Sequence, residues 1–215
     1  MLKTIKNSFG KEIAPSGPAK ERILSNRGFT LIEMAVVLAI IAVLAAVLTP
    51  MVTNYLDQAR VVRATADVKT IADAIRLYER DTAKWPIFTS SGQSSAVATE
   101  LVGPGNAPTA GASWAAYTTT TGLIGQLNTN FLGLSTGSQV TNPGRVAYRG
   151  PYIGALDSDP WGNQYVVTAT NLNSGVSNWA IVISAGPNGT LDSNPNQANT
   201  ATFTATNDDI VAIIK

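Results

Sequence analysis

The stretch RGFTLIE, residues Arg27–Glu33, decides how this chain folds, because it leads directly into the apolar run Met34–Leu48. The next charged residue after Glu33 is Asp57. An acidic side chain costs about 2.5–3.5 kcal/mol at the centre of a membrane-spanning helix, and such residues usually mark a function or a specific partner. Glu33 is therefore a candidate functional residue.

Basic residues are concentrated before this stretch. Residues 1–28 contain six of the fifteen Lys and Arg residues but only two of the fourteen acidic residues, so their removal leaves a net charge of about −3. Such a chain has little electrostatic support for binding nucleic acid, and we expect no nucleic-acid partner. The basic segment fits the rule that positive flanks of a membrane segment stay in the cytoplasm.

The chain contains neither cysteine nor histidine. Without cysteine no disulfide forms, so packing, hydrogen bonds or a metal must hold the fold. Without histidine, Ser-His-Asp triads, histidine-ligated zinc and histidine acid–base chemistry are excluded. We therefore expect a protein that is not an enzyme and has no organic cofactor.

An ordinary cleaved secretory signal is one alternative for the apolar run, whose 15 residues suit such a segment. Two details oppose it. Glu33 places a charge at the start of the run, and the following residues 49–52 lack a small-x-small cleavage site. A simple uncleaved membrane anchor is the second alternative.

From Thr53 onward the sequence becomes amphipathic. Spacings of three and four residues, typical of a helix, relate the apolar-face positions Val61, Thr65, Val68, Ala72, Ile75 and Tyr78. The pattern predicts one helix from Phe29 to about Arg80, roughly 78 Å long at 1.5 Å per residue. We expect its first half to lie in lipid or in a filament core, and its second half to pack against a globular domain.

Pro50 interrupts this helix pattern. Proline removes a backbone donor and clashes with the preceding turn, so a kink or local melting is expected there. One interpretation is a tolerated transmembrane proline. The other is that the helix unwinds near Pro50 when the subunit leaves the bilayer and assembles.

Lys84-Trp85-Pro86 ends the predicted helix, because the residue before a proline disfavours helical geometry. Residues 87–147 are rich in Thr, Ser, Gly and Ala and read as an elaborated loop region, with short helices predicted at Ser95–Val102 and Thr120–Leu127. Further on, β-branched and aromatic runs predict three strands, at residues 165–169, 179–183 and 210–214.

These elements predict an α+β fold, with the long helix packed on a small C-terminal antiparallel sheet. The expected organisation is a leader, a transmembrane or filament-core helix, an amphipathic helix, a loop region and a C-terminal sheet region, at residues 1–28, 29–52, 53–86, 87–147 and 148–215.

The six residues Gly28–Glu33 and their apolar extension resemble the processing signal of type IV prepilins and type II secretion pseudopilins. In that family a membrane aspartyl peptidase cuts between the residues matching Gly28 and Phe29 and then methylates the new amine. The resemblance therefore implies a mature N-terminus at Phe29. Gly28 suits such a peptidase, because glycine presents no side-chain obstruction.

The same resemblance implies a partner for Glu33. In a filament core, a carboxylate without a counter-charge is strongly unfavourable. In the family, this glutamate meets the N-terminal amine of a neighbouring subunit, which would make Phe29 and Glu33 assembly residues that set the axial register. Pro50 joins them as an assembly residue. The alternative is that Glu33 is only an anion placed favourably in the first turns of a helix.

A second resemblance covers the C-terminal part of the chain. The segments GPY (150–152), DPWGNQY (159–165) and SAGPNG (184–189) resemble segments of the major pseudopilin of type II secretion systems, as does Asp209-Ile210. We interpret the first two as a tight turn entering a strand, with Trp161 as a core anchor. Their role is architectural rather than chemical.

In that family the loop before the last strand binds calcium. Residues 184–209 form a connection of 26 residues, which is long for a compact domain unless something orders it. The candidate ligands are Ser184, Asn188, Asp192, Asp208 and Asp209, since Ca²⁺ prefers oxygen donors. Asn188 departs from the family's aspartate. A metal-free turn, with a strand at Thr200–Thr206, is the alternative.

The sequence therefore predicts a structural subunit of a pilus-like filament, most plainly the major pseudopilin of a type II secretion system. The precursor is expected as a single-pass inner-membrane protein and the filament as periplasmic or extracellular. The implied partners are further copies of the chain, minor pseudopilins or pilins, prepilin peptidase and an inner-membrane assembly platform. Alternatives are a major type IV pilin of a surface pilus and a membrane-anchored binding module.

Overall fold

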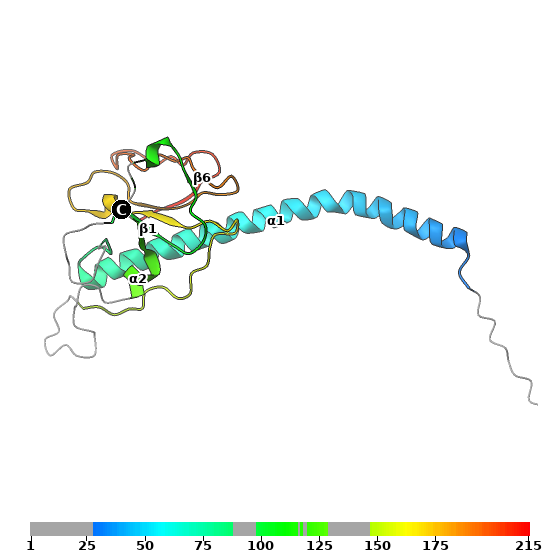
Figure 1. Ribbon diagram of the computed structural model, residues 1–215, viewed down its shortest axis with the longest axis horizontal. Coiled ribbons are helices and arrows are strands. Elements are labelled where there is room, and N and C mark those ends of the chain that lie inside the picture. Colours follow the sequence, from blue (N-terminus) through cyan, green and yellow to red (C-terminus); the bar gives the residue numbers. More distant parts are fainter. Residues whose placement is uncertain (1–27, 88–97, 116, 118–119, 129–146) are drawn as a thin grey trace, which may run out of the picture. The chain divides into compact units, whose positions relative to one another are not determined.

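The computed structural model describes residues 28–87, 98–115, 117, 120–128 and 147–215 (Figure 1). By its contacts the chain divides into two compact units, residues 1–49 and residues 50–215. Each unit is described by itself below. The predicted leader lies outside the described residues, apart from Gly28.

Helix α1 extends over Leu31–Thr82, close to the predicted range. By length and composition it could cross a membrane. It ends at Ala83, whose φ of 52° places this residue in the left-handed region and whose amide donates to the carbonyl of Glu79 at 2.7 Å. Such a residue is a common way to stop a helix and satisfy its last carbonyls.

Unit 2 contains a five-stranded sheet in the order β3-β1-β4-β5-β7. The strands are β1 (Glu100–Val102), β3 (Thr120–Gly122), β4 (Val166–Thr168), β5 (Ile181–Ser184) and β7 (Ile210–Ile213). The three predicted strands are β4, β5 and β7, and the α+β fold class is confirmed. These three strands pair antiparallel, as predicted, but the sheet as a whole is mixed, because β1 pairs parallel with β3.

The reason for this difference lies in the region interpreted as loops. Within the predicted helix 95–102, the first three residues lie outside the described part, and Glu100–Val102 form a strand against β4. The second predicted helix begins at Thr120 as strand β3 and becomes helical only in α2 (Leu123–Asn128). Tertiary pairing overrides weak local preference here. A further short helix that the sequence did not predict, α3 (Ala169–Leu172), follows β4 directly.

One face of the sheet packs on the second part of α1. The helix contributes an apolar stripe of Val68, Ile71, Ala72, Ile75 and Tyr78, all at most 1% exposed, against a sheet face that includes Val167 and Val182. The stripe follows the predicted spacing from Val68 onward. The predicted positions Val61 and Thr65 are exposed, because packing on the domain begins at Ala64.

The outer edge of β7 is tied to the same helix. The Arg76 guanidinium donates to the carbonyl of Ile213 at 2.7 Å and to that of Ile214 at 3.1 Å. Arg76 also forms an ion pair with Asp73 at 2.8 Å, one turn earlier on α1. One arginine therefore links the helix to the end of the last strand.

The other face of the sheet is covered by loops. Its core contains Trp114, Ile181, Ile183 and Leu191, with Trp114 only 1% exposed. Trp114 closes the short 3-10 helix η1 (Ala112–Trp114). The prediction that Trp161 is a core anchor was wrong, because its side chain is only partly buried and belongs to neither core cluster, whereas Trp114 is fully buried.

Two two-residue strands tie these covering loops together. They are β2 (Thr109–Ala110) and β6 (Thr190–Leu191), which pair in parallel. Strand β6 lies inside the 26-residue connection, whereas the alternative strand at Thr200–Thr206 does not form.

Glu100 is a buried carboxyl group, 8% exposed, on strand β1. Burial raises the pKa of Glu100 from its ordinary 4.5 to about 7. Between these values the folded chain binds more protons than the unfolded chain, so stability falls as the pH rises from about 4.5 to about 7 and is lowest above that range. At 1.36 kcal/mol per pKa unit, the ionised group costs about 3 kcal/mol.

We expect Glu100→Gln to remove this cost, because glutamine is neutral and similar in shape. Urea unfolding of the purified chain in detergent should show the variant more stable than the wild type at pH 8, and much less so at pH 5. Asp157→Asn, at an exposed carboxylate, is the matched control. An equal gain for Glu100→Gln at both pH values would contradict this account.

Candidate functional site

The peptide bond between Gly28 and Phe29 is freely accessible. A Cβ atom added at Gly28 would have no neighbour within 4 Å, and Phe29 is 85% exposed. Both residues precede α1, so the bond lies in non-helical backbone. The structure therefore presents the predicted processing site without obstruction by the described parts of the chain.

Glu33 and Thr30 cap the start of α1. The Glu33 carboxylate Oε2 accepts from the Thr30 amide at 2.7 Å and from the Thr30 hydroxyl at 2.8 Å. In return the Glu33 amide donates to the Thr30 hydroxyl at 3.2 Å. This reciprocal arrangement is a capping box, which satisfies amides that the first helical turn leaves free. The alternative reading of Glu33 as a favourably placed anion is therefore physically sound, and Thr30 is a residue that the sequence analysis missed.

The capping box uses only one of the two carboxylate oxygens of Glu33. Both bonds from Thr30 end on Oε2, and among the described residues no hydrogen bond to Oε1 is found. The carboxylate also borders a shallow apolar groove formed with Phe29, Ile32, Val36 and Val37. A cation that approached along this groove would meet the free oxygen.

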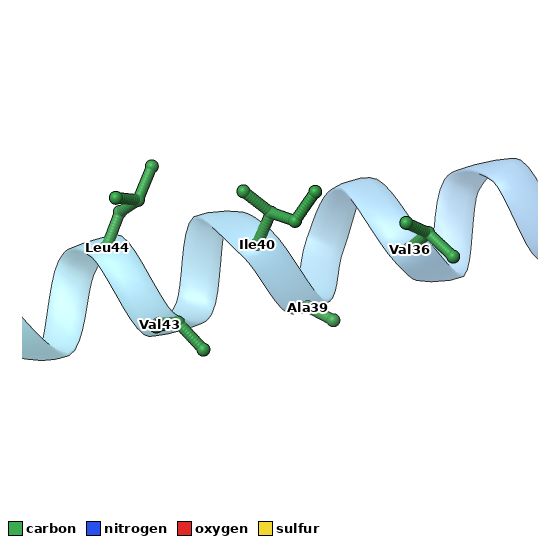
Figure 2. A pocket seen from close by; sticks show the side chains of 5 residues that line it. All are labelled: Val36, Ala39, Ile40, Val43 and Leu44. Carbon is green, nitrogen blue, oxygen red and sulfur yellow. The ribbon is translucent and has the colours of Figure 1, made fainter.

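The helical part of unit 1 is not covered by any other residue that the structure describes. Every residue from Gly28 to Thr49 is exposed. Figure 2 shows Val36, Ala39, Ile40, Val43 and Leu44 along this helix, where they line a second shallow groove that is almost entirely apolar. Such a surface exceeds what a monomer leaves in water, so it requires lipid or another protein.

Pro50 lies within α1, and residues on both sides of it are helical. The predicted local melting is thus absent from the described residues 28–87 of this isolated chain. The Thr49 hydroxyl donates to the carbonyl of Ala45 at 2.7 Å, and the Thr53 hydroxyl donates to the carbonyl of Pro50 at 3.0 Å. Neither bond reaches the carbonyl of Ala46, which is the one that the missing amide of Pro50 leaves without its helical donor. Unwinding during assembly stays a prediction.

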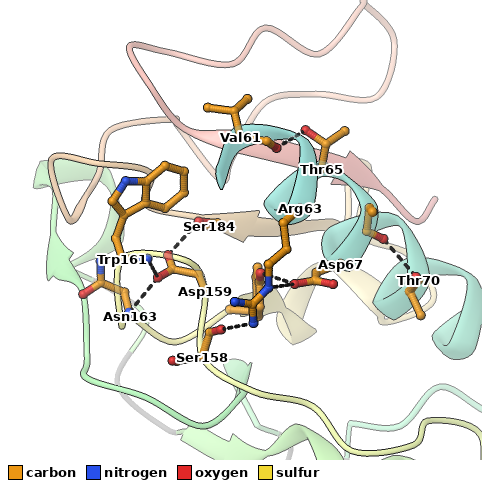
Figure 3. Close-up of polar contacts among 12 residues, drawn as sticks. Val61, Arg63, Thr65, Asp67, Thr70, Ser158, Asp159, Trp161, Asn163 and Ser184 are labelled. Atoms are coloured by element: carbon orange, nitrogen blue, oxygen red, sulfur yellow. Dashed lines mark hydrogen bonds and ion pairs between the residues drawn. The ribbon is translucent and has the colours of Figure 1, made fainter. Parts of the chain in front are cut away.

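The DPWGN segment forms a turn that is organised by Asp159 (Figure 3). Asp159 is 2% exposed, and its Oδ1 accepts from the amides of Trp161 at 3.0 Å and Asn163 at 2.7 Å. Its Oδ2 accepts from the Ser184 hydroxyl at 2.8 Å. Ser184, a predicted calcium ligand, is therefore engaged by this turn. The result is the architectural role expected for the segment, carried by Asp159 rather than by Trp161.

Helix α1 contacts the same turn through Arg63 (Figure 3). The Arg63 guanidinium donates to the carbonyl of Ser158 at 3.2 Å and lies 3.5 Å from the Asp67 carboxylate. Asp67 also accepts from the Tyr165 hydroxyl at 2.8 Å. Burial and this hydrogen bond both raise the pKa of Tyr165. These contacts fix the turn against the helix within unit 2.

The loop after β5 brings together the other predicted calcium ligands. Asp208 Oδ2 accepts from the Asn188 amide at 2.8 Å, while Asp192 Oδ2 accepts from the side-chain amides of Asn188 at 2.9 Å and Asn207 at 2.8 Å. Asp209 Oδ2 accepts from the amides of Asp192 at 2.9 Å and Ser193 at 2.6 Å. Asn207, in the left-handed region at φ 54°, is a member of this cluster that the sequence analysis missed.

The cluster fits a hard cation in the kind of donor that it offers. Asp209 is 7% exposed, and its Oδ1 atom is buried without a hydrogen-bond partner. Burial raises the pKa of Asp209. The hydrogen bonds that Asp192 accepts from the side-chain amides of Asn207 and Asn188 lower the pKa of Asp192. No group of three acidic side chains among the described residues already converges on one point, so a cation would require the amide side chains to turn.

Comparison with known proteins gives these sites a family context. Residues 23–49 match the model of the prokaryotic N-terminal methylation motif, and this match includes Gly28, Phe29 and Glu33. The chain is 28% identical over 165 residues to type II secretion system core protein G of Escherichia coli, covering 77% of this chain and 84% of the relative. The corresponding protein of Klebsiella pneumoniae is 26% identical over 174 residues, covering 80% and 93%.

The chain is homologous to type II secretion system core protein G, the major pseudopilin.

A higher identity is confined to one part of the chain. The protein of the same name from Pseudomonas aeruginosa is 46% identical over 59 residues, which cover 27% of this chain and 42% of that relative. No solved structure matches the chain significantly. The chain thus combines the methylation motif at its start with homology to core protein G over most of its length.

The Asp159 turn allows a direct test of the pseudopilin domain. Asp159→Ala removes one buried acceptor of three hydrogen bonds, which should lower the free energy of unfolding by about 2–4 kcal/mol. The exposed Asp157→Ala, two residues away, should change it by less than about 0.5 kcal/mol. Urea unfolding of the chain in detergent measures both values, and equal stabilities would contradict the role of Asp159.

Proposed function

We propose that this chain is the major subunit of a type II secretion pseudopilus. One observation carries the proposal: a complete processing motif at Gly28–Glu33 opens a helix whose first part, Leu31–Thr49, is wholly exposed and, apart from Glu33 and Thr49, apolar. Lipid can cover that surface before assembly, and helices of neighbouring copies can cover it afterwards. The protein's chemistry on this reading is assembly, not catalysis.

The first step is processing at the membrane. The precursor is held as a single-pass inner-membrane protein with its basic leader on the cytoplasmic side. Prepilin peptidase cuts the accessible bond after Gly28 and methylates the new amine of Phe29. Cleavage places a positive charge one residue before Thr30, at the same helix end as the Glu33 carboxylate.

The second step is assembly into a filament. The unperturbed pKa of an α-amino group is about 8, so the new terminus is largely positive at neutral pH. A neighbouring copy presents this amine to Glu33, whose Oε1 is free of Thr30. Pairing two opposite charges in an apolar core fixes the axial register, because any shifted register leaves an uncompensated charge. An inner-membrane platform and minor pseudopilins are the further partners, and the filament lies in the periplasm.

A surface-displayed type IV pilin is the second candidate. It is favoured by the long basic leader and by the length of the stretch 87–147 in the sequence. Neighbouring genes would distinguish the two: a secretin and further pseudopilins on one side, or a retraction ATPase and adhesins on the other. A membrane-anchored binding module would not need an intact Gly28–Glu33 motif.

The processing step has a defined product. Intact-mass and peptide mass spectrometry of the membrane-extracted protein should show a chain that begins with N-methylated Phe29. Gly28→Leu should leave the leader attached, because the added side chain blocks close approach of the peptidase to the backbone. A mature wild-type chain that starts at another residue would contradict the proposal.

The assembly step depends on Glu33. Glu33→Ala should be exported and cleaved normally but should give no sheared filaments in electron microscopy. Asp57→Ala, which removes a solvent-exposed carboxylate of α1 that pairs with Arg60, is the control and should still polymerise. Normal filaments from Glu33→Ala would show that no charge pair is needed.

We propose in addition that the loop between β5 and β7 holds Ca²⁺. Its ligands would be Asp192, Asp208, Asp209 and the side-chain carbonyl of Asn188, completed by backbone carbonyls. Support comes from the partnerless buried Oδ1 of Asp209 and from the purely oxygen-based donor set. When bound, the cation neutralises the carboxylates and links the two ends of the loop.

Calcium addition should raise the melting temperature of the full chain in detergent above its value in EDTA, because a ligand that binds only the folded state stabilises it. Asp209→Asn should abolish this rise, and the exposed Asp157→Asn should keep it. If the wild-type melting temperature is the same in both buffers, the loop holds no calcium.

A further inference from the structure

Residues Gly103–Ala115 contact both the Asp159 turn and the candidate calcium loop; we name this stretch the strap. At its start the strap is bonded to the Asp159 turn: the Asn106 amide donates to the carbonyl of Gly162, and the Gln164 amide donates to the carbonyl of Asn106, both at 2.9 Å. The Gly103 amide donates to the carbonyl of Tyr165, also at 2.9 Å. The strap is thus anchored on a rigid turn before it reaches the candidate calcium loop.

Its middle part pairs with that loop. Strand β2 of the strap lies parallel to β6, with Thr109 opposite Thr190 and Ala110 opposite Leu191. The Thr109 amide donates to the carbonyl of Gly189 at 2.8 Å. These contacts engage the loop between Asn188 and Asp192, two of its candidate ligands.

At its C-terminal end the strap packs Trp114 against the loop. The indole is 1% exposed, packs in one cluster with Leu191 and Ile183, and donates from Nε1 to the carbonyl of Ser193 at 2.8 Å. The Ser193 amide in turn donates to Asp209 Oδ2 at 2.6 Å. Trp114 is therefore one residue removed from the carboxylate that carries the partnerless oxygen.

The fit between strap and loop is close. A Cβ atom added at Gly111 would overlap the carbonyl oxygen of Leu191. The backbone of Gly111, with φ −67° and ψ 169°, is ordinary for any residue, so the restriction comes from space alone. Gly111→Ala therefore disturbs the contact without straining the backbone.

We propose that the strap orders the loop before any cation binds, and that Trp114 is the positioning residue for Asp209. When a loop becomes ordered only on binding its metal, the entropy cost of that ordering weakens the binding. A loop that is already ordered has a smaller cost and binds the ion more tightly. The ordering stands on the contacts above, while its effect on calcium affinity rests on the calcium site proposed in the preceding subsection.

Hydrogen–deuterium exchange of the full chain in detergent tests the ordering. In EDTA the wild-type amides of residues 186–193 should be protected. In Trp114→Phe and in Gly111→Ala they should exchange about tenfold faster, as expected when local opening becomes easier by roughly one hydrogen bond. Amides of β4, β5 and the second part of α1 should keep their protection. Gly154→Ala, at an exposed glycine with no neighbour within 4 Å of an added Cβ, is the control and should match the wild type.

Added CaCl₂ separates the two proposals. Restored protection in Gly111→Ala, with a calcium affinity several-fold below that of the wild type, supports both. Unrestored protection together with fast exchange in EDTA leaves the strap inference standing and contradicts the calcium site. Free exchange of the wild-type loop in EDTA, or full protection of both variants there, overturns the strap inference.

Discussion

The structure depends on one unmet requirement: no other described residue covers the apolar helix between Leu31 and Thr49. Water is a poor solvent for such a surface, at roughly 25 cal/mol for each square ångström of apolar area. The helix therefore needs a surrounding that is itself apolar. A bilayer supplies one kind and a bundle of like helices another, so a chain of this design can move from one to the other without losing hydrophobic burial.

The second part of α1 solves a different problem with the same element. From Val68 to Tyr78 it provides the stripe on which the sheet closes, and Arg63 and Asp67 fasten the Asp159 turn to it. Polar fastening and apolar packing thus come from neighbouring faces of one helix.

The strongly periodic elements could be predicted from the sequence, but little of the loop structure could. The bounds of α1 and the places of β4, β5 and β7 followed from apolar spacing and β-branched runs, which report local preference and burial together. Strands β1 and β3 could not be predicted, because Glu100 and Thr120 enter the sheet through distant partners rather than through any preference of their own. The role of Trp114 is equally non-local, since its partner Ser193 lies 79 residues further along. At the candidate site, Asp192, Asp208 and Asp209 were recognisable as oxygen donors, whereas the contribution of Asn207 depends on its left-handed backbone.

The hydrogen bonds between Arg76 and the end of β7 matter where many copies of the domain lie close together. Strand β7 reads Ile-Val-Ala-Ile and forms one border of the sheet, and uncovered borders of this kind recruit strands from other molecules. A polymer holds its subunits at very high local concentration, where such strand addition would join the globular domains in arbitrary orientations. By occupying the carbonyls of Ile213 and Ile214, Arg76 removes acceptors that a foreign strand would use. This end of the border is therefore protected against the addition of a foreign strand.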